Sequence, residues 1–204
     1  MKLETIYGEL LDIMKNGMDF TKALSLKEKL EKAIREETCY KTGSKTRVNA
    51  IKRVASKDNS RPALTGYGIY NEFKVVTDSY HLIAIKEENM PLKLVTTDDE
   101  LANKVGKENC ICFNYPNLEM LIKYDTSNEL NMFDLVDLES FCKMHKKDGE
   151  LYQIGDQLFN PHYVKNVVDV LGKDFKIYYQ GENRPLFFVN DKEEIGLVVP
   201  KRKY

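Results

Sequence analysis

Imidazoles and carboxylates are the side chains of this sequence that would act as general acids, bases or metal ligands. The histidines are His81, His145 and His162, and the acidic clusters are Asp98–Glu100 and Asp134–Glu139. No Gly-rich phosphate loop, nucleophile elbow or metal-binding histidine pair accompanies them. We therefore expect the acids to be solvated and the histidines to be structural or exposed. These patterns predict a protein that is not an enzyme and that needs no cofactor.

Thiols are the other reactive groups, and there are four of them: Cys39, Cys110, Cys112 and Cys142. Their spacing matches no zinc template, because the Cys110–Cys112 pair supplies only two ligands and the histidines lie far away in the sequence. In a strand these two thiols would share one face, where buried free cysteines behave as small hydrophobic side chains. The sequence predicts structural thiols, no metal site and a reducing, cytoplasmic setting.

The charge balance excludes a strong general attraction to polyanions. The chain of 204 residues has 31 Lys plus Arg and 32 Asp plus Glu, a net charge of -1. Binding to nucleic acid would therefore need a local basic patch. Nowhere do eighteen apolar residues run together, so we expect no membrane span.

The first part of the chain is predicted to be helical. Apolar residues recur at helical spacing from Lys2 to Asn16, and again from an N-cap at Asp19 to about Glu37. We expect these two helices to form a hairpin. After a polar turn at 41–45, a third amphipathic helix runs through Val48 to about Lys57, and its outer face is basic.

Strand patterns follow this third helix, rich in β-branched and aromatic residues and broken by short polar turns. The predicted strands are Ala63–Tyr70, Glu72–Thr77 and Tyr80–Lys86. The middle of the chain has a weaker pattern. It predicts strands at Leu92–Thr96 and Cys110–Asn114, and helices at Tyr115–Ile122 and Asp134–His145.

The last quarter of the sequence has the clearest signals. A strand at Leu151–Leu158 precedes Asn160, a good N-cap, and Pro161, which suits the first position of a helix. That helix should end at Gly172. The strands predicted after it are Asp174–Gln180, Pro185–Asn190 and Ile195–Pro200. The order of one short helix and three strands thus occurs twice, which predicts an internal structural repeat.

Three segments near the end resemble the sliding clamps of DNA polymerases, above all the bacterial beta clamp: Phe159–Val164, Gly181–Leu186 and Leu197–Arg202. That family has a Phe-Asn-x-Lys-Tyr-Leu helix and a terminal Met-Pro-x-Arg in the corresponding places. A second set of segments resembles the first half of a clamp domain: Ala50–Ser56, Ser60–Gly66 and Val76–Leu82. The resemblance departs at His162, which replaces the usual Lys, and at Val199, which replaces the usual Met.

The resemblance implies an α+β clamp-like domain at residues 45–204, with an insertion around 88–148 and a helical extension at 1–40. A bacterial clamp has three such domains in each chain and closes a ring of six, whereas this chain has one clear copy, or two if the middle of the chain hides another. The apolar stripes of the helices at 1–37 would favour self-association through a separate surface, so we expect a monomer or small dimer and not a closed ring. We also expect a source in a phage or mobile element.

Clamp helices offer cations to DNA phosphates without reading bases. The matching DNA-binding positions here are Arg47, Lys52, Arg53, Lys57, Arg61, Lys165 and Lys173. The alternative is that these cations form an ordinary solvated helix face.

Clamps also bind short peptides of replication or repair proteins in an apolar pocket beside the last strand. Leu197, Val199 and Pro200 fall there by resemblance, and alternatively they are core residues of a final strand. Two other functions stay open: a clamp-fold protein-interaction module without DNA binding, and a helix-turn-helix DNA reader built on the basic helix. The turn before that helix looks too long for the latter.

Overall fold

The computed structural model describes residues 20–42, 44–130, 150–154, 156–172 and 174–201. It divides into two compact units, which we describe separately. One contains α2 (Phe20–Thr42), and the other contains the chain from Thr46 onward except residues 89–91. The second predicted helix is thus confirmed and extends to Thr42. The predicted helices at 2–16 and 134–145 lie outside the described residues.

The larger unit contains the predicted repeat of one helix and three strands. The first copy consists of α3 (Lys45–Val54), β1 (Gly68–Tyr70), β2 (Phe73–Thr77) and β3 (His81–Ile85). The second copy consists of α7 (Pro161–Leu171), β9 (Phe175–Tyr179), β10 (Leu186–Asn190) and β11 (Ile195–Val198). Asn160 caps α7 as predicted, because its side chain accepts a hydrogen bond from the His162 N–H. The α+β class and the repeat are therefore confirmed.

The two copies form one seven-stranded sheet in the order β1-β2-β3-β11-β10-β9-β6. Its centre is the antiparallel pair β3 and β11, in which His81 lies opposite Val198 and Ala84 opposite Ile195. The third strands of the two copies, β3 and β11, pair antiparallel, and the second and first strands of each copy follow outward in the same order. The two copies are therefore related by a local two-fold axis that passes through the sheet between β3 and β11. Every residue of these two strands is buried, because both faces of the sheet are covered.

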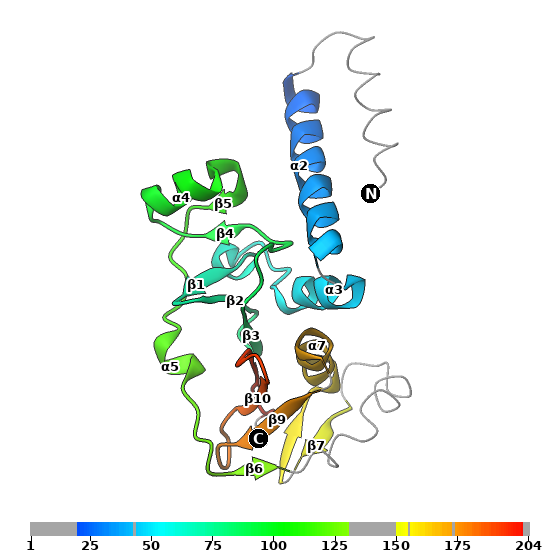
Figure 1. The fold of residues 1–204 in the computed structure, drawn as a ribbon, viewed down its shortest axis with the longest axis vertical. Helices are drawn as coiled ribbons and strands as arrows, with labels where there is room; N and C mark the ends of the chain where they lie inside the picture. Colours follow the sequence, from blue (N-terminus) through cyan, green and yellow to red (C-terminus); the bar gives the residue numbers. More distant parts are fainter. Residues whose placement is uncertain (1–19, 43, 131–149, 155, 173, 202–204) are drawn as a thin grey trace. The chain divides into compact units, whose positions relative to one another are not determined.

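The two helices of the repeat lie on one face of the sheet (Figure 1). There α7 packs across β3, β10 and β11. Gly196 allows this close approach, because a Cβ atom at that position would lie 2.2 Å from Cγ1 of Val167. Any larger residue at 196 would push α7 away from the central strands.

The other face of the sheet is covered by the segment that contains α5 (Glu119–Ile122). Leu118 and Ile122 join the core of this face, and the Tyr124 ring stacks on Phe187. The Tyr115 hydroxyl donates to the Val75 carbonyl at 2.9 Å. These contacts fill the face opposite α3 and α7 from within the chain.

Several predicted elements are shorter than expected or of a different kind. The Pro62–Leu64 stretch is a 3-10 helix with proline in its first turn, so the strand predicted from Ala63 begins only at Gly68. The single strand predicted at 151–158 is a hairpin of β7 (Tyr152–Ile154) and β8 (Gln157–Phe159). Asp156, between these strands, is a residue type that favours a turn.

The middle of the chain contains β4 (Leu94–Val95), α4 (Asp99–Val105), a 3-10 turn at Lys107–Asn109, β5 (Cys110–Ile111), α5 and β6 (Glu129–Leu130). The helix predicted at 115–122 is wrong for its first half, where Pro116 disfavours helical geometry in the residue before it. None of the helices in the described part of the chain combines the length and the apolar character needed to cross a membrane.

Candidate nucleic-acid interface on α3 and α7

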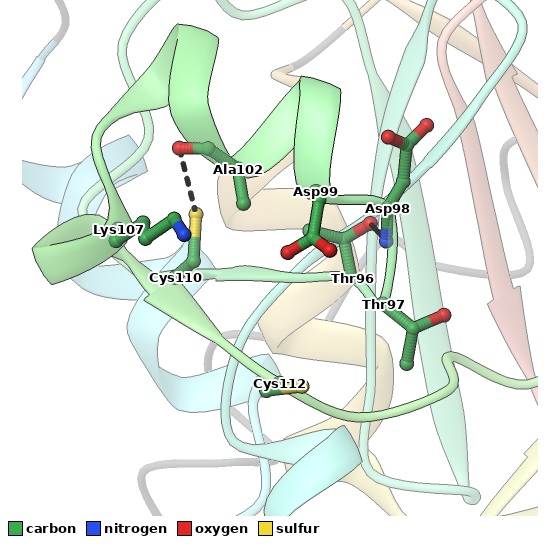
Figure 2. A pocket seen from close by; sticks show the side chains of 8 residues that line it. All are labelled: Thr96, Thr97, Asp98, Asp99, Ala102, Lys107, Cys110 and Cys112. Atoms are coloured by element: carbon green, nitrogen blue, oxygen red, sulfur yellow. Dashed lines mark hydrogen bonds between the residues drawn. The ribbon is translucent and has the colours of Figure 1, made fainter.

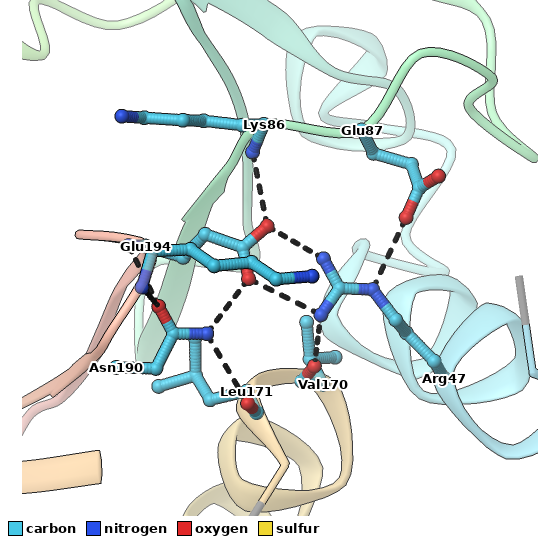
Figure 3. A network of polar contacts seen from close by, with 8 residues as sticks. Arg47, Lys86, Glu87, Val170, Leu171, Asn190 and Glu194 are labelled. Carbon is cyan, nitrogen blue, oxygen red and sulfur yellow. Dashed lines mark hydrogen bonds and ion pairs between the residues drawn. The ribbon is translucent and has the colours of Figure 1, made fainter. Parts of the chain in front are cut away.

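Arg47, in the first turn of α3, is bound inside the domain (Figure 3). Its Nη2 and Nη1 atoms donate to the Glu194 carboxylate at 2.7 and 3.2 Å, and its Nε donates to Glu87 at 3.1 Å. Nη1 also donates to the carbonyl of Val170 in α7. The guanidinium therefore ties α3 to the β10–β11 turn and to the end of α7.

Glu194 is 1% exposed and fully satisfied by these contacts and two more. It accepts from the Lys86 N–H at 3.1 Å and from Nδ2 of Asn190 at 2.8 Å. Burial by itself would raise the pKa of this carboxyl, but the hydrogen bonds from Arg47 and Asn190 and the charge of Arg47 lower it. Burial likewise opposes the charge of Arg47, and the two glutamates outweigh it and raise the pKa of the guanidinium. The charge of Arg47 is therefore engaged inside the fold, apart from the other predicted DNA-binding residues.

Arg53 joins α3 to α7 on the outside of the helix pair. Its Nε donates to Oδ1 of Asn166 at 2.8 Å, and its Nη2 donates to Oδ2 of Asp169 at 2.7 Å. Lys165 donates to the other oxygen of Asp169, also at 2.7 Å. The predicted cations Arg53 and Lys165 are thus brought together around one acid.

The remaining predicted DNA-binding residues follow the exposed side of α3 and the loop after it. Lys52 is half-buried in the last turn of α3, and Lys57 and Arg61 are exposed beyond it. Arg61 approaches Asp58 only to 3.9 Å, which is a weak surface pair. Lys173 lies outside the described residues. Four cations, Lys52, Arg53, Lys57 and Arg61, therefore follow one another from the last turn of α3 into the loop after it, with the exposed acid Asp58 among them.

His81, one of the histidines noted in the sequence, is a buried structural residue. Its Nδ1 lies 2.8 Å from Oδ1 of Asp78 and its Nε2 lies 3.3 Å from Nδ2 of Asn166. Burial would raise the pKa of Asp78, but the hydrogen bonds and charge of His81 lower it. Since both ring nitrogens are engaged, His81 has no nitrogen available as a general base. Its contact with Asn166 instead fixes the amide that holds Arg53.

The predicted partner-binding residues separate into core and surface. Leu197 and Pro200 are buried, whereas Val199 is 38% exposed. The Val199 N–H donates to the Tyr80 carbonyl at 2.9 Å, and Tyr80 is 56% exposed. The Tyr80 ring stacks on Tyr163 of α7 with 5.8 Å between centroids. We call Tyr80, Tyr163 and Val199 the aromatic patch. Tyr80 is missed by sequence reasoning because its pairing with Val199 depends on the sheet.

A pocket of about 150 Å³ opens in the segment between β4 and β5 (Figure 2). Its lining residues are Thr96, Thr97, Asp98, Asp99, Ala102, Lys107, Cys110 and Cys112. Asp98 is used as the N-cap of α4 and accepts from the N–H groups of Glu100 and Leu101.

The thiols of this pocket do not form a reactive pair. Cys110 donates to the Gly106 carbonyl at 3.4 Å, and burial raises the pKa of its thiol. The expectation that both thiols are buried is wrong for Cys112, which is exposed because β5 ends at Ile111. In the described ranges no three His, Cys, Asp or Glu side chains are grouped to hold a metal ion.

Comparison with solved structures shows that this fold is similar to that of bacterial beta sliding clamps. A beta sliding clamp from C. crescentus is 13% identical, with a TM-score of 0.51 over 78% of this chain and 63% of the clamp chain. The DNA polymerase III beta chain of Streptococcus pneumoniae is 18% identical, with a TM-score of 0.51 over 78% and 62%. DNA polymerase III subunit beta from Borrelia burgdorferi is 13% identical, with a TM-score of 0.52 over 85% and 62%.

No protein-family model and no curated protein matches the sequence. The chain spans less than two thirds of the length of these clamp chains. At such identities the likeness establishes the fold, and the clamp-like architecture implied by the sequence resemblance is confirmed.

The Arg47–Glu194 pair predicts an acid-sensitive fold. Because the folded pKa of Glu194 is lowered, its contribution to the unfolding free energy is present above the ordinary glutamate pKa and is lost as pH falls through the folded value. Glu194→Gln should cost about 3 kcal/mol at neutral pH, since it removes the buried carboxylate bound by Nη1 and Nη2 of Arg47 and leaves Glu87 as the remaining acid beside that guanidinium. It should also flatten the loss of stability in acid.

Urea unfolding between neutral pH and acid measures both effects. Glu129→Gln, which removes an exposed pair with Lys176, is the matched control and should follow the parent protein. A Glu194→Gln variant with the same acid dependence as the parent would show that the pair is not coupled to folding.

Proposed function

We propose that this protein is a non-enzymatic clamp-fold factor that binds the phosphate backbone of duplex DNA through the outer side of α3 and α7. The observation that carries this proposal is the strip formed by Lys52, Arg53, Lys57 and Arg61 beside the helix pair. The apolar side of α3 is buried while these cations are on the outside. Cations on a rigid helix pair suit binding to phosphates without base recognition.

The small number of cations in this strip favours weak, salt-sensitive binding of DNA over tight binding. The whole chain has a net charge of -1, so attraction is local. Arg47 is engaged with Glu194, and Arg53 and Lys165 share Asp169. Lys57 and Arg61 lie in the loop after α3, where Arg61 makes only a weak pair with Asp58 at 3.9 Å.

The test of this proposal is the salt dependence of binding. Neutralising Lys52, Lys57 and Arg61 together to Gln should weaken binding to a short labelled duplex at low salt. It should also reduce the slope of log affinity against log salt by up to about 0.9 for each phosphate contact removed. Fluorescence anisotropy at several salt concentrations gives both quantities.

A control with the same change of charge is Lys104, Lys123 and Lys176, also replaced by Gln. All three are exposed, and none belongs to α3 or α7. This control should keep the parent slope. Equal slopes for both triple variants would remove α3 from the binding surface.

The aromatic patch supports a second function, the binding of short apolar peptides from partner proteins. Tyr80 and Val199 expose apolar surface side by side, and the Tyr163 ring supports Tyr80 from α7. Exposed aromatic side chains on a rigid base are typical anchors for a peptide side chain. This surface would serve a clamp-fold interaction module with or without DNA.

Peptide selection tests this second function. Peptides selected from a random display library on the parent protein should share apolar anchors, and Tyr80→Ala should lose most of their binding because the main exposed ring is removed. Ile69→Ala is the control, since Ile69 is a 43% exposed residue of the edge strand β1. Peptides that bind both variants equally would place the binding surface elsewhere.

A further inference from the structure

Asp169 lies between two cations that come from different copies of the repeat. Its Oδ2 accepts from Arg53 of α3 and its Oδ1 accepts from Lys165 of α7, each at 2.7 Å. The Asp169 side chain is 13% exposed, whereas Arg53 is 43% and Lys165 is 32% exposed. The acid thus sits deeper than the cations that it holds.

The position of Arg53 is fixed from a second side. Its Nε donates to Asn166, and the amide of Asn166 contacts the buried His81, which is itself held by Asp78. This chain of polar contacts runs from the β2–β3 turn through α7 to α3. Arg53 is therefore held by two neighbours in α7, one neutral and one negative.

Two oxygens of one carboxylate make the contacts here that two oxygens of a phosphate group would make. Arginine and lysine both bind phosphate through short, charge-assisted hydrogen bonds. With Asp169 in place, a backbone phosphate must either displace the carboxylate from Arg53 and Lys165 or bind farther out than the carboxylate. In both cases the negative charge of Asp169 repels the phosphate.

We propose that Asp169 limits the affinity of the α3–α7 surface for a phosphate backbone by occupying, between Arg53 and Lys165, the place that a phosphate would take. The inference rests on the proposed function, because it concerns the same surface. In the natural chain the duplex is then held mainly by Lys52, Lys57 and Arg61. Arg53 and Lys165 contribute little to this binding because both are already paired with Asp169.

Asp169→Asn tests the inference with little change of shape. The amide oxygen can still accept one hydrogen bond, so the thermal unfolding temperature should stay close to that of the parent. Affinity for a short labelled duplex at low salt should rise by about tenfold, and the salt slope should steepen by about 0.9 to 1.8 as one or two further phosphate contacts form. Glu119→Gln, which makes the same change of charge on α5, should leave the slope unchanged.

A second probe separates this inference from the proposed function. Inorganic phosphate should shift the NMR signal of the Arg53 Nε–H in Asp169→Asn and leave it nearly unmoved in the parent. A phosphate response in Asp169→Asn without duplex binding by any variant would support the role of Asp169 and overturn the proposed function. A parent that binds duplex while Asp169→Asn behaves like Glu119→Gln, or an Arg53 signal that phosphate never moves, would overturn the role of Asp169.

Discussion

Antiparallel pairing of β3 with β11 joins the two copies of the repeat, and the positions of the other elements in the larger unit follow from it. Both strands are buried on both faces, so a change of register by one residue would turn His81 and Gly196 to the wrong side. The register places Gly196 under Val167, and α7 can then lie directly on the central strands. The charged surface outside the helix pair depends on this fit.

Polar contacts across the local two-fold axis complete the connection between the copies. Arg47 of the first helix reaches Glu194 in the second copy, and Asn166 of the second helix reaches His81 in the first. Each helix is thus held by the hairpin of the other copy. Because these contacts satisfy buried polar groups, breaking either one affects both copies. The pair of Arg53 and Asp169 also joins the helices of the two copies, so its geometry depends on the buried contacts beneath it.

The sequence predicts the repeat well because local signals specify its elements. Asn160, Pro161 and Gly172 mark the ends of α7, and alternating apolar residues mark the strands. It fails where long-range contacts decide the structure. Arg47 has the same residue type and helix position whether it faces DNA or Glu194, and the separation of 147 positions in the sequence hides their pairing. The aromatic patch is hidden for the same reason, since Tyr80 and Val199 become neighbours only across the central strands.

Backbone amide shifts of the labelled protein, recorded as a short duplex is added at low salt, measure most directly whether the helix pair is the working surface. If the helix pair binds the duplex, the shifts should concentrate from Lys52 to Arg61 and along the exposed side of α7, and they should fade as salt is raised. Residues of α5, on the opposite face of the sheet, should stay unchanged. Shifts confined to α5 and the sheet face that it covers, or shifts that persist at high salt, would show that the helix pair does not bind DNA phosphates.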